Sequence, residues 1–231
     1  MSDLASRDVE KLETASLRER VYDQLKSLIL SNSLLPGQQI VIDQLARQMG
    51  VSHTPIREAL AMLELEGLVV MTHYKNARVS KIDADDVREV YEMRRILEGW
   101  AAGVAALSFS NQEIQDLVKL KQIFCQQENK ENFKALLDAD ILLHDLIINQ
   151  IDNRLFSRIS ELVNLQSRRI RTLVEAIQGV KHADTRNQEH CDIVDAITSR
   201  DPVRARSDME LHLVNAQQRT ISALEEIKET E

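Results

Sequence analysis

One stretch constrains the fold of this chain more than any other. It spans residues 45–68 and reads LARQMGVSHTPIREALAMLELEGL. Gly50 can adopt the positive φ that reverses the chain after a short amphipathic helix, and Ser52 is a good N-cap for a second helix. The pattern predicts a helix-turn-helix. The apolar residues that recur at the spacing of one buried helical face are Ile56, Leu60 and Leu63.

The second helix of this motif carries side chains that a recognition helix presents to DNA. Pro55 is tolerated in its first turn, and Thr54 and Arg57 lie where a helix in the major groove contacts bases. A helical hairpin without a DNA partner would show a similar pattern, so both interpretations stay open here. If the motif binds DNA, the candidate contact residues are Arg47, Ser52, His53, Thr54 and Arg57.

A β-hairpin is predicted directly after the helix-turn-helix. Two strand-like runs, residues 68–71 and 77–79, flank a turn that ends at Asn76, and Asn tolerates the left-handed conformation. With a first helix over about 17–31, these elements make a winged helix. Lys75 and Asn76 would lie at the wing tip, on phosphate or in the minor groove, although Lys75 also fits an ordinary exposed lysine.

The net charge of −8 is unfavourable for a nucleic-acid binder, because affinity for DNA comes largely from neutralised phosphates. The acidity is unevenly spread, however. Residues 1–80 contain 9 Lys and Arg against 10 Asp and Glu, whereas the remaining residues contain 20 against 27. A nearly neutral N-terminal module would need its basic residues on one face and two copies on the DNA, so we expect a homodimer.

The cysteine count and the hydropathy pattern indicate the compartment. The two cysteines, Cys125 and Cys191, do not provide a disulfide framework, which favours a reducing cytoplasm. The polar N-terminal sequence resembles no signal peptide, and apolar runs stay well short of membrane length. We therefore expect a soluble cytoplasmic protein that does not enter a membrane.

From Asp83 onward the periodicity is wholly helical. Ser110 and Glu113 make a capping box, and Asp201 with Pro202 begins the last helix. The sequence predicts a mainly α protein, with a winged helix-turn-helix over 15–80 and an antiparallel helical bundle over 84–227. In the first bundle helix, Val87, Val90, Met93, Leu97 and Ala101 are expected to be buried. The predicted helices of the bundle span about 84–107, 111–127, 130–150, 154–178, 183–199 and 202–226.

Four residues of the helical part have the chemistry of a metal site. Asp140 and His144 are four apart, so they leave one helix from the same face, while His190 and His212 lie within two further helices beside core residues. A carboxylate and three imidazoles would bind Zn or a similar divalent ion and leave coordination positions open. Asp-x-x-x-His also arises by accident, and helical histidines are often merely hydrogen-bonded, so spacing alone does not decide.

The N-terminal part resembles the DNA-binding domain of the GntR family of bacterial transcription regulators. The similarity covers about residues 17–79 and rests on LLPGQQIVIDQLARQMGVSHTPIREALAMLELEGLV, against a family pattern close to PG, LA, GVSRTPVREAL and EGL. His53 stands where the family usually has Arg, and Asn76 where it usually has Gly. The first difference affects one expected base or phosphate contact and indicates a variant operator.

The C-terminal part resembles the FCD ligand-binding domain of the FadR-type branch of that family, over roughly residues 87–214. Arg94 begins the family's Arg-x-x-Leu-Glu pattern. The resemblance implies that a metal is held by Asp140, His144, His190 and His212. Arg94 could bind the carboxylate of an effector, since a guanidinium is the fork-shaped partner of such a group. It could equally form an i, i+4 pair with Glu98.

The patterns and the resemblance together imply a cytoplasmic transcription regulator, most simply a repressor. Its homodimer would read a palindromic operator in double-stranded DNA, and a small organic acid bound at the metal would control that binding. One alternative is a helical metalloenzyme in which Glu189 or Glu210 acts as base for a metal-bound water. Another is a sensor for which the metal itself is the signal.

Overall fold

The computed structural model describes residues 16–73, 76–125, 133–178 and 183–228, and the chain divides into two compact units after Lys81. Lys75, the predicted wing-tip lysine, lies outside the described residues, as do the predicted helix ends at 126–127 and 130–132. The two units are described separately below.

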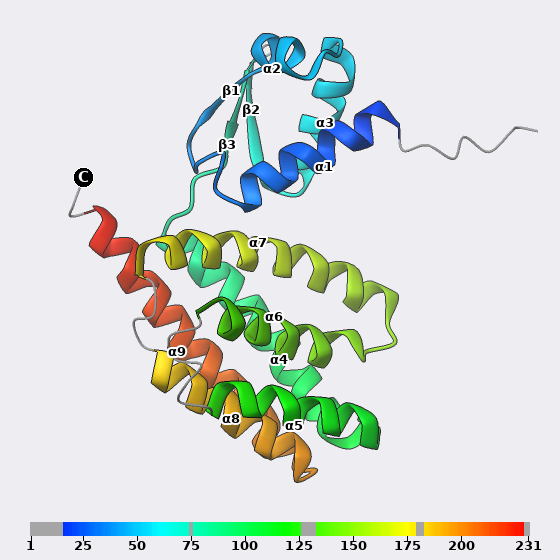
Figure 1. The fold of residues 1–231 in the computed structure, drawn as a ribbon, viewed down its shortest axis with the longest axis vertical. Coiled ribbons are helices and arrows are strands. Elements are labelled where there is room, and N and C mark those ends of the chain that lie inside the picture. Colours follow the sequence, from blue (N-terminus) through cyan, green and yellow to red (C-terminus); the bar gives the residue numbers. More distant parts are fainter. Residues whose placement is uncertain (1–15, 74–75, 126–132, 179–182, 229–231) are drawn as a thin grey trace, which may run out of the picture. The chain divides into compact units, whose positions relative to one another are not determined.

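The first unit is a winged helix (Figure 1). Its sheet is antiparallel in the order β1-β3-β2, so β3 lies between the hairpin partner β2 and the short strand β1. The hairpin confirms the sequence prediction. β1 was not predicted, because a three-residue strand depends on its long-range pairing with β3 and leaves little periodicity. The elements are α1 (Leu17–Leu30), β1 (Gln39–Val41), α2 (Ile42–Met49), α3 (His53–Leu65), β2 (Val69–His73) and β3 (Asn76–Val79).

The helix-turn-helix consists of α2 and α3, as the sequence predicts. Gly50 ends α2 with a φ of 65°, the left-handed conformation that lets the chain turn sharply. Ser52 occupies the N-cap position of α3, but its side chain makes no capping hydrogen bond, which leaves the hydroxyl available on the surface. Ile56, Leu60 and Leu63 are fully buried, in agreement with their spacing.

The second unit contains only helices in its described part, again as predicted (Figure 1). Helix α4 contacts α6, α7, α8 and α9, and α9 runs antiparallel to it. The direction follows from Tyr91 opposite Thr220 at one end and Gly103 against the carbonyl oxygen of Pro202 at the other. The helices are α4 (Ala84–Ser108), α5 (Asn111–Cys125), α6 (Phe133–Asn149), α7 (Arg154–Gln178), α8 (Ala183–Thr198) and α9 (Pro202–Lys228).

Side-chain caps fix where these helices begin. The Ser110 hydroxyl accepts from the backbone N–H of Glu113, whose carboxylate accepts from the backbone N–H of Ser110, which confirms the predicted capping box. The Asp201 carboxylate accepts from the backbone N–H of Arg204 at the start of α9. Asp83 forms a further capping box with Asp86 and starts α4.

The buried face of α4 differs from the prediction at one position. Val87 and Ala101 are buried and Val90 and Leu97 are partly buried, but Met93 is exposed. The helix is rotated so that the charged neighbour Arg94 faces the interior instead. Hydrophobic periodicity misplaces such a residue because it assigns charged side chains to solvent.

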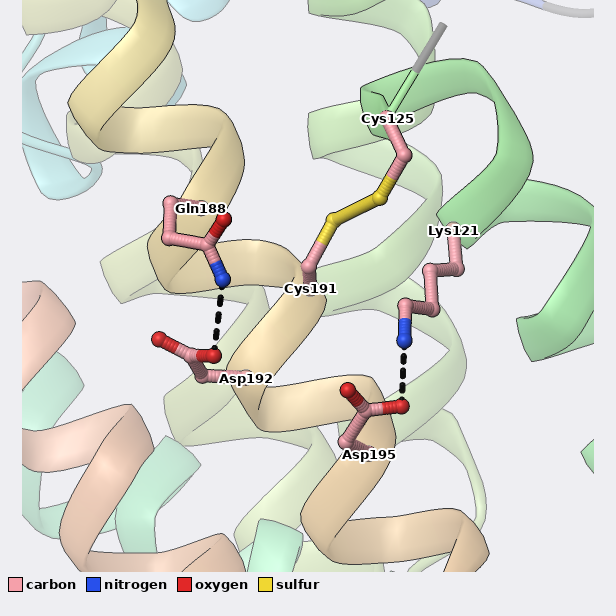
Figure 2. Close-up of a disulfide and its surroundings, with 6 residues drawn as sticks. All are labelled: Lys121, Cys125, Gln188, Cys191, Asp192 and Asp195. Atoms are coloured by element: carbon pink, nitrogen blue, oxygen red, sulfur yellow. Dashed lines mark hydrogen bonds and ion pairs between the residues drawn. A yellow bond between two sulfur atoms is a disulfide. The ribbon is translucent and has the colours of Figure 1, made fainter.

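Two further findings concern the compartment prediction. No described helix combines the length and apolarity needed to cross a bilayer. Contrary to the expectation for the cysteines, Cys125 and Cys191 are joined in a disulfide that connects α5 to α8 (Figure 2). The sequence does not predict this pair, because only the packing of α5 on α8 brings two positions 66 residues apart into contact.

Candidate metal centre and DNA-binding surface

The four predicted ligand residues converge in the core of the helical unit. Asp140 and His144 come from α6, His190 from α8 and His212 from α9. One ligand atom from each lies within 4.8 Å of the others, and all four side chains are buried. Four ligand-type groups within this distance can surround a single ion.

Two imidazole nitrogens point at one carboxylate oxygen without forming hydrogen bonds to it. His190 Nε2 lies 3.0 Å and His144 Nε2 lies 3.5 Å from Asp140 Oδ1. Both nitrogens are buried and lack a hydrogen-bond partner in the described part of the chain. Unpartnered buried polar atoms are costly unless another group satisfies them. A divalent cation would bind all of these atoms, so the residues present fit a metal.

Carboxylates behind the cluster hold two of the histidines. His144 Nδ1 hydrogen-bonds to Glu98 on α4, and His212 Nδ1 lies 2.8 Å from Glu189 Oε2 on α8. Glu189 is itself fixed by Arg219, which donates two hydrogen bonds of 2.8 and 2.9 Å. Such carboxylate–histidine pairs turn the other ring nitrogen toward a metal and increase its basicity.

The protonation states of the cluster suit a cation. Burial raises the pKa of Asp140, but the Arg171 guanidinium and the neighbouring histidines outweigh it and hold the pKa well below its usual value. Burial, together with the charge of nearby His190, lowers the pKa of His212 to about 3. Burial also lowers the pKa of His190. At His144 burial acts in the same direction, but the carboxylates of Glu98 and Asp140 outweigh its effect and raise the pKa. Asp140 is therefore ionised and two imidazoles are neutral, the forms that bind metals.

Two arginines lie against this cluster. The Arg94 guanidinium is buried and donates to Glu98 through Nε at 2.6 Å and Nη2 at 3.3 Å. Arg171, on α7, hydrogen-bonds through Nη1 to Asp140, while its Nε has no partner among the described residues. The i, i+4 pair of Arg94 with Glu98 is thus present, and Arg171 is a second guanidinium at the site.

The other predicted side chains lie on the winged helix. Arg47 on α2 and Ser52, His53, Thr54 and Arg57 at the start of α3 are exposed, whereas Asn76 begins β3 and is partly buried. His53 Nε2 lies 3.2 Å from Asp43 Oδ1 on α2, so this unusual histidine has a local carboxylate partner. The first turn of α3 therefore offers solvent-facing polar groups where a recognition helix meets DNA.

Comparison with known families shows to which protein family this chain belongs. The family model described as bacterial regulatory proteins, gntR family, matches residues 17–79, and the FCD domain model matches residues 89–215. The chain belongs to the GntR family and carries an FCD domain. It is therefore a DNA-binding transcription regulator.

Relatives of this GntR regulator match it along most of their length. The uncharacterised HTH-type transcriptional regulator YdhC of Bacillus subtilis (strain 168) is 28% identical over 213 residues, which cover 90% of this chain and 92% of YdhC. The HTH-type transcriptional repressor NanR of Cronobacter sakazakii is 24% identical over 233 residues, covering 92% and 89%. The structure of Escherichia coli McbR/YncC shares the fold with a TM-score of 0.72 at 18% identity, covering 93% of this chain and all of that one.

The family and these relatives are regulators and not enzymes. The alternative of a metalloenzyme with Glu189 or Glu210 as base is accordingly wrong. In the structure Glu189 supports His212, and Glu210 accepts a hydrogen bond from Arg206 on the surface of α9.

Sequence reasoning did not assign three residues to the candidate metal centre. Glu98 was expected only as a partner of Arg94, Glu189 only as the base of an enzyme, and Arg171 was not singled out. For Glu98 a signal exists, because it lies four residues after Arg94 and one turn from Ala101 and Ala102, on the face that α4 buries. Arg171 and Glu189 reach the site across helix boundaries, which no spacing within one helix reveals.

Proposed function

We propose that this GntR regulator is a repressor whose operator binding is controlled by a small organic acid bound at a metal in the FCD domain. The observation that carries the proposal is the buried cluster of Asp140, His144, His190 and His212, in which ring nitrogens of His144 and His190 have no hydrogen-bond partner among the described residues. Three imidazoles and one carboxylate suit Zn or a similar divalent ion. These four ligands leave coordination positions for a carboxylate of the effector.

An anionic effector is supported by the two guanidinium groups that lie beside the cluster. Arg94 is the predicted partner of its carboxylate, and Arg171 adds a second guanidinium beside Asp140. Asn187 lies one turn before His190 on α8, is buried, and has neither amide atom hydrogen-bonded within the described chain. A compact hydroxy or keto acid would satisfy such groups together, since each offers hydrogen bonds that only a polar ligand can complete.

DNA binding is proposed to require a homodimer. Two winged helices would read a palindrome, with Thr54 and Arg57 reaching bases or phosphates and Arg47, Ser52, His53, Asn76 and Lys75 assisting. The helical unit has apolar side chains exposed on α4 and α9 that a second copy could cover, namely Ile96, Leu107, Val203 and Leu211. A protein of this kind acts in the cytoplasm, where its operator is.

The effector changes DNA affinity only if it binds one arrangement of the dimer more tightly than another. Release from the operator is the expected outcome, in keeping with the repressor NanR among the relatives. An alternative is that the metal alone is the signal, which the same assay distinguishes.

The test is fluorescence anisotropy of labelled DNA from upstream of the gene that encodes the protein, against scrambled DNA at the same salt. The protein is loaded with Zn, and a panel of small organic acids is added. We expect sequence-specific binding that one acid reverses, and no response in the double variant His190→Ala, His212→Ala. Equal weak binding to both DNAs would contradict autoregulation, and an operator affinity that depends on Zn without any acid would favour the metal sensor.

A further inference from the structure

The disulfide ties the end of one helix to the middle of another. Cys125 is the last residue of α5 and is exposed, whereas Cys191 lies within α8 and is buried (Figure 2). One helical turn away, Lys121 Nζ lies 2.5 Å from Asp195 Oδ1 and links the same two helices. Because residue 125 faces 191 and residue 121 faces 195, α5 and α8 run antiparallel along this contact.

Each cysteine is adjacent in the chain to a residue that lies at the proposed metal centre. Cys191 directly follows the ligand residue His190. Phe124 directly precedes Cys125, is buried, and its ring centroid lies 4.6 Å from that of His190. The position of α5 against α8 therefore also determines how the Phe124 ring packs on a ligand imidazole.

We propose that Cys125 and Cys191 form a peroxide-sensitive thiol pair whose oxidation slows release of the metal from the FCD domain. The proposal rests on the proposed metal centre. Neither cysteine is placed as a metal ligand, and the chain has only these two cysteines, so the pair is separate from the coordinating groups.

Cys125, the exposed residue of the pair, reacts first. The Cys125 thiolate attacks one oxygen of hydrogen peroxide, the O–O bond breaks, and the products are a sulfenic acid and hydroxide, which takes up a proton to become water. Cys191 Sγ then attacks the Cys125 sulfur, the S–S bond forms, the S–O bond breaks, and a second water leaves with the thiol proton. In total two thiols are oxidised and one peroxide is reduced to two waters. A dithiol reductant reverses the reaction through a mixed disulfide, which forms at the exposed residue Cys125.

The two redox states differ in what holds α5 beside His190. In the oxidised state a covalent bond fixes Phe124 against the imidazole, so the ligand is already oriented for the ion. In the reduced state the disulfide is gone, and the Lys121–Asp195 ion pair, whose side chains are partly exposed, is the link that stays. Such pairs contribute little in water. Oxidation should therefore slow the opening through which the metal leaves.

The experiment uses the full chain loaded with Zn²⁺, first reduced with dithiothreitol and desalted, then divided and treated with or without hydrogen peroxide. Intact mass reports the disulfide as a loss of two hydrogen atoms, and a chromogenic chelator reports the rate of Zn²⁺ release. We expect the disulfide to form and release to slow several-fold, with both changes reversed by dithiothreitol. Cys125→Ser should release Zn²⁺ at the rate of the reduced protein whether or not peroxide is added.

Each failure has a separate meaning. A mass gain of oxygen atoms without loss of hydrogen overturns the thiol pair, and a disulfide that leaves the release rate unchanged overturns the coupling. If neither form binds Zn²⁺ while the disulfide still forms, the metal centre is wrong and the coupling falls with it. Because Cys125 is exposed at a helix end, its Ser variant should fold, which circular dichroism checks; Cys191→Ala is the second variant and should show the same insensitivity to peroxide.

Discussion

The substitution Glu98→Gln removes one charge from a fully buried ion pair of the helical unit. Glu98 and Arg94 are each at most 2% exposed, and Glu98 also hydrogen-bonds to Nδ1 of His144. Gln keeps the shape of the side chain but leaves the Arg94 guanidinium without its counter-charge. The change therefore tests the stability of the helical unit and the orientation of a proposed metal ligand together.

The magnitude follows from burial. Breaking a buried ion pair by neutralising one partner typically costs about 3–5 kcal/mol, because the remaining charge stays out of water unpaired. With an m value of about 2–3 kcal/mol per M of urea, the midpoint of unfolding should fall by roughly 1–2.5 M. Loss of the carboxylate behind His144 should weaken Zn binding by about 10- to 100-fold.

The single tryptophan makes the assay specific for the helical unit. Trp100 lies on α4 and packs against Phe156 of α7, with ring centroids 5.3 Å apart. Its fluorescence during urea unfolding should therefore follow this unit and not the winged helix. Zn affinity is measured separately by competition with a chelator of known affinity.

The matched control is Glu92→Gln, which removes a carboxylate from an exposed position of the same helix. It should change the free energy of unfolding by less than about 0.5 kcal/mol, as surface substitutions do, and leave the Zn affinity unchanged. If Glu98→Gln behaves like this control in both measurements, the argument that Glu98 holds Arg94 and His144 is refuted.

Three further predictions concern the recognition helix, the buried histidines and the disulfide. Arg57→Ala should weaken operator binding by about 1–3 kcal/mol in anisotropy titrations without changing the circular dichroism spectrum; unchanged affinity would remove Arg57 from the contact surface. His212 has a pKa near 6.5 when unfolded and about 3 when folded, so the unfolded state takes up its proton first as the pH falls. In EDTA, the stability advantage of wild type over His212→Asn should therefore be larger at pH 7 than at pH 5, and a constant difference would contradict the buried neutral ring. The variant Cys125→Ser cannot form the disulfide, so its free energy of unfolding should be about 2–4 kcal/mol lower than that of the oxidised wild type, in which the bond closes a loop with a sequence separation of 66. Equal urea midpoints would show that the bond adds no stability.

Local signals in the sequence predicted most of the fold. Gly50 and the apolar spacing in α3 located the helix-turn-helix, and the Ser110–Glu113 box and Asp201 located two helix starts in the bundle. These features depend on residues within one or two turns of each other. The strand β1 was missed because its hydrogen bonds come from β3, far along the chain.

The candidate site was predicted as far as its ligand residues and not beyond. Asp140 and His144 share one helix face, His190 and His212 lie beside core residues of two further helices, and the resemblance to the FCD domain favoured all four as one ligand set. The burial of Arg94 in place of Met93 was not foreseeable from hydropathy, because a charged side chain enters a core only when a partner such as Glu98 is already there. The contact between Cys125 and Cys191 likewise depends on how α5 packs against α8.

The central claim is that Asp140, His144, His190 and His212 hold a divalent metal. Isothermal titration of Zn²⁺ into EDTA-treated and desalted protein tests it most directly. One ion should bind per wild-type chain, and none should bind with comparable affinity to the His190→Ala, His212→Ala variant. Absence of stoichiometric binding to the wild type, or equal binding to the double variant, would contradict the account.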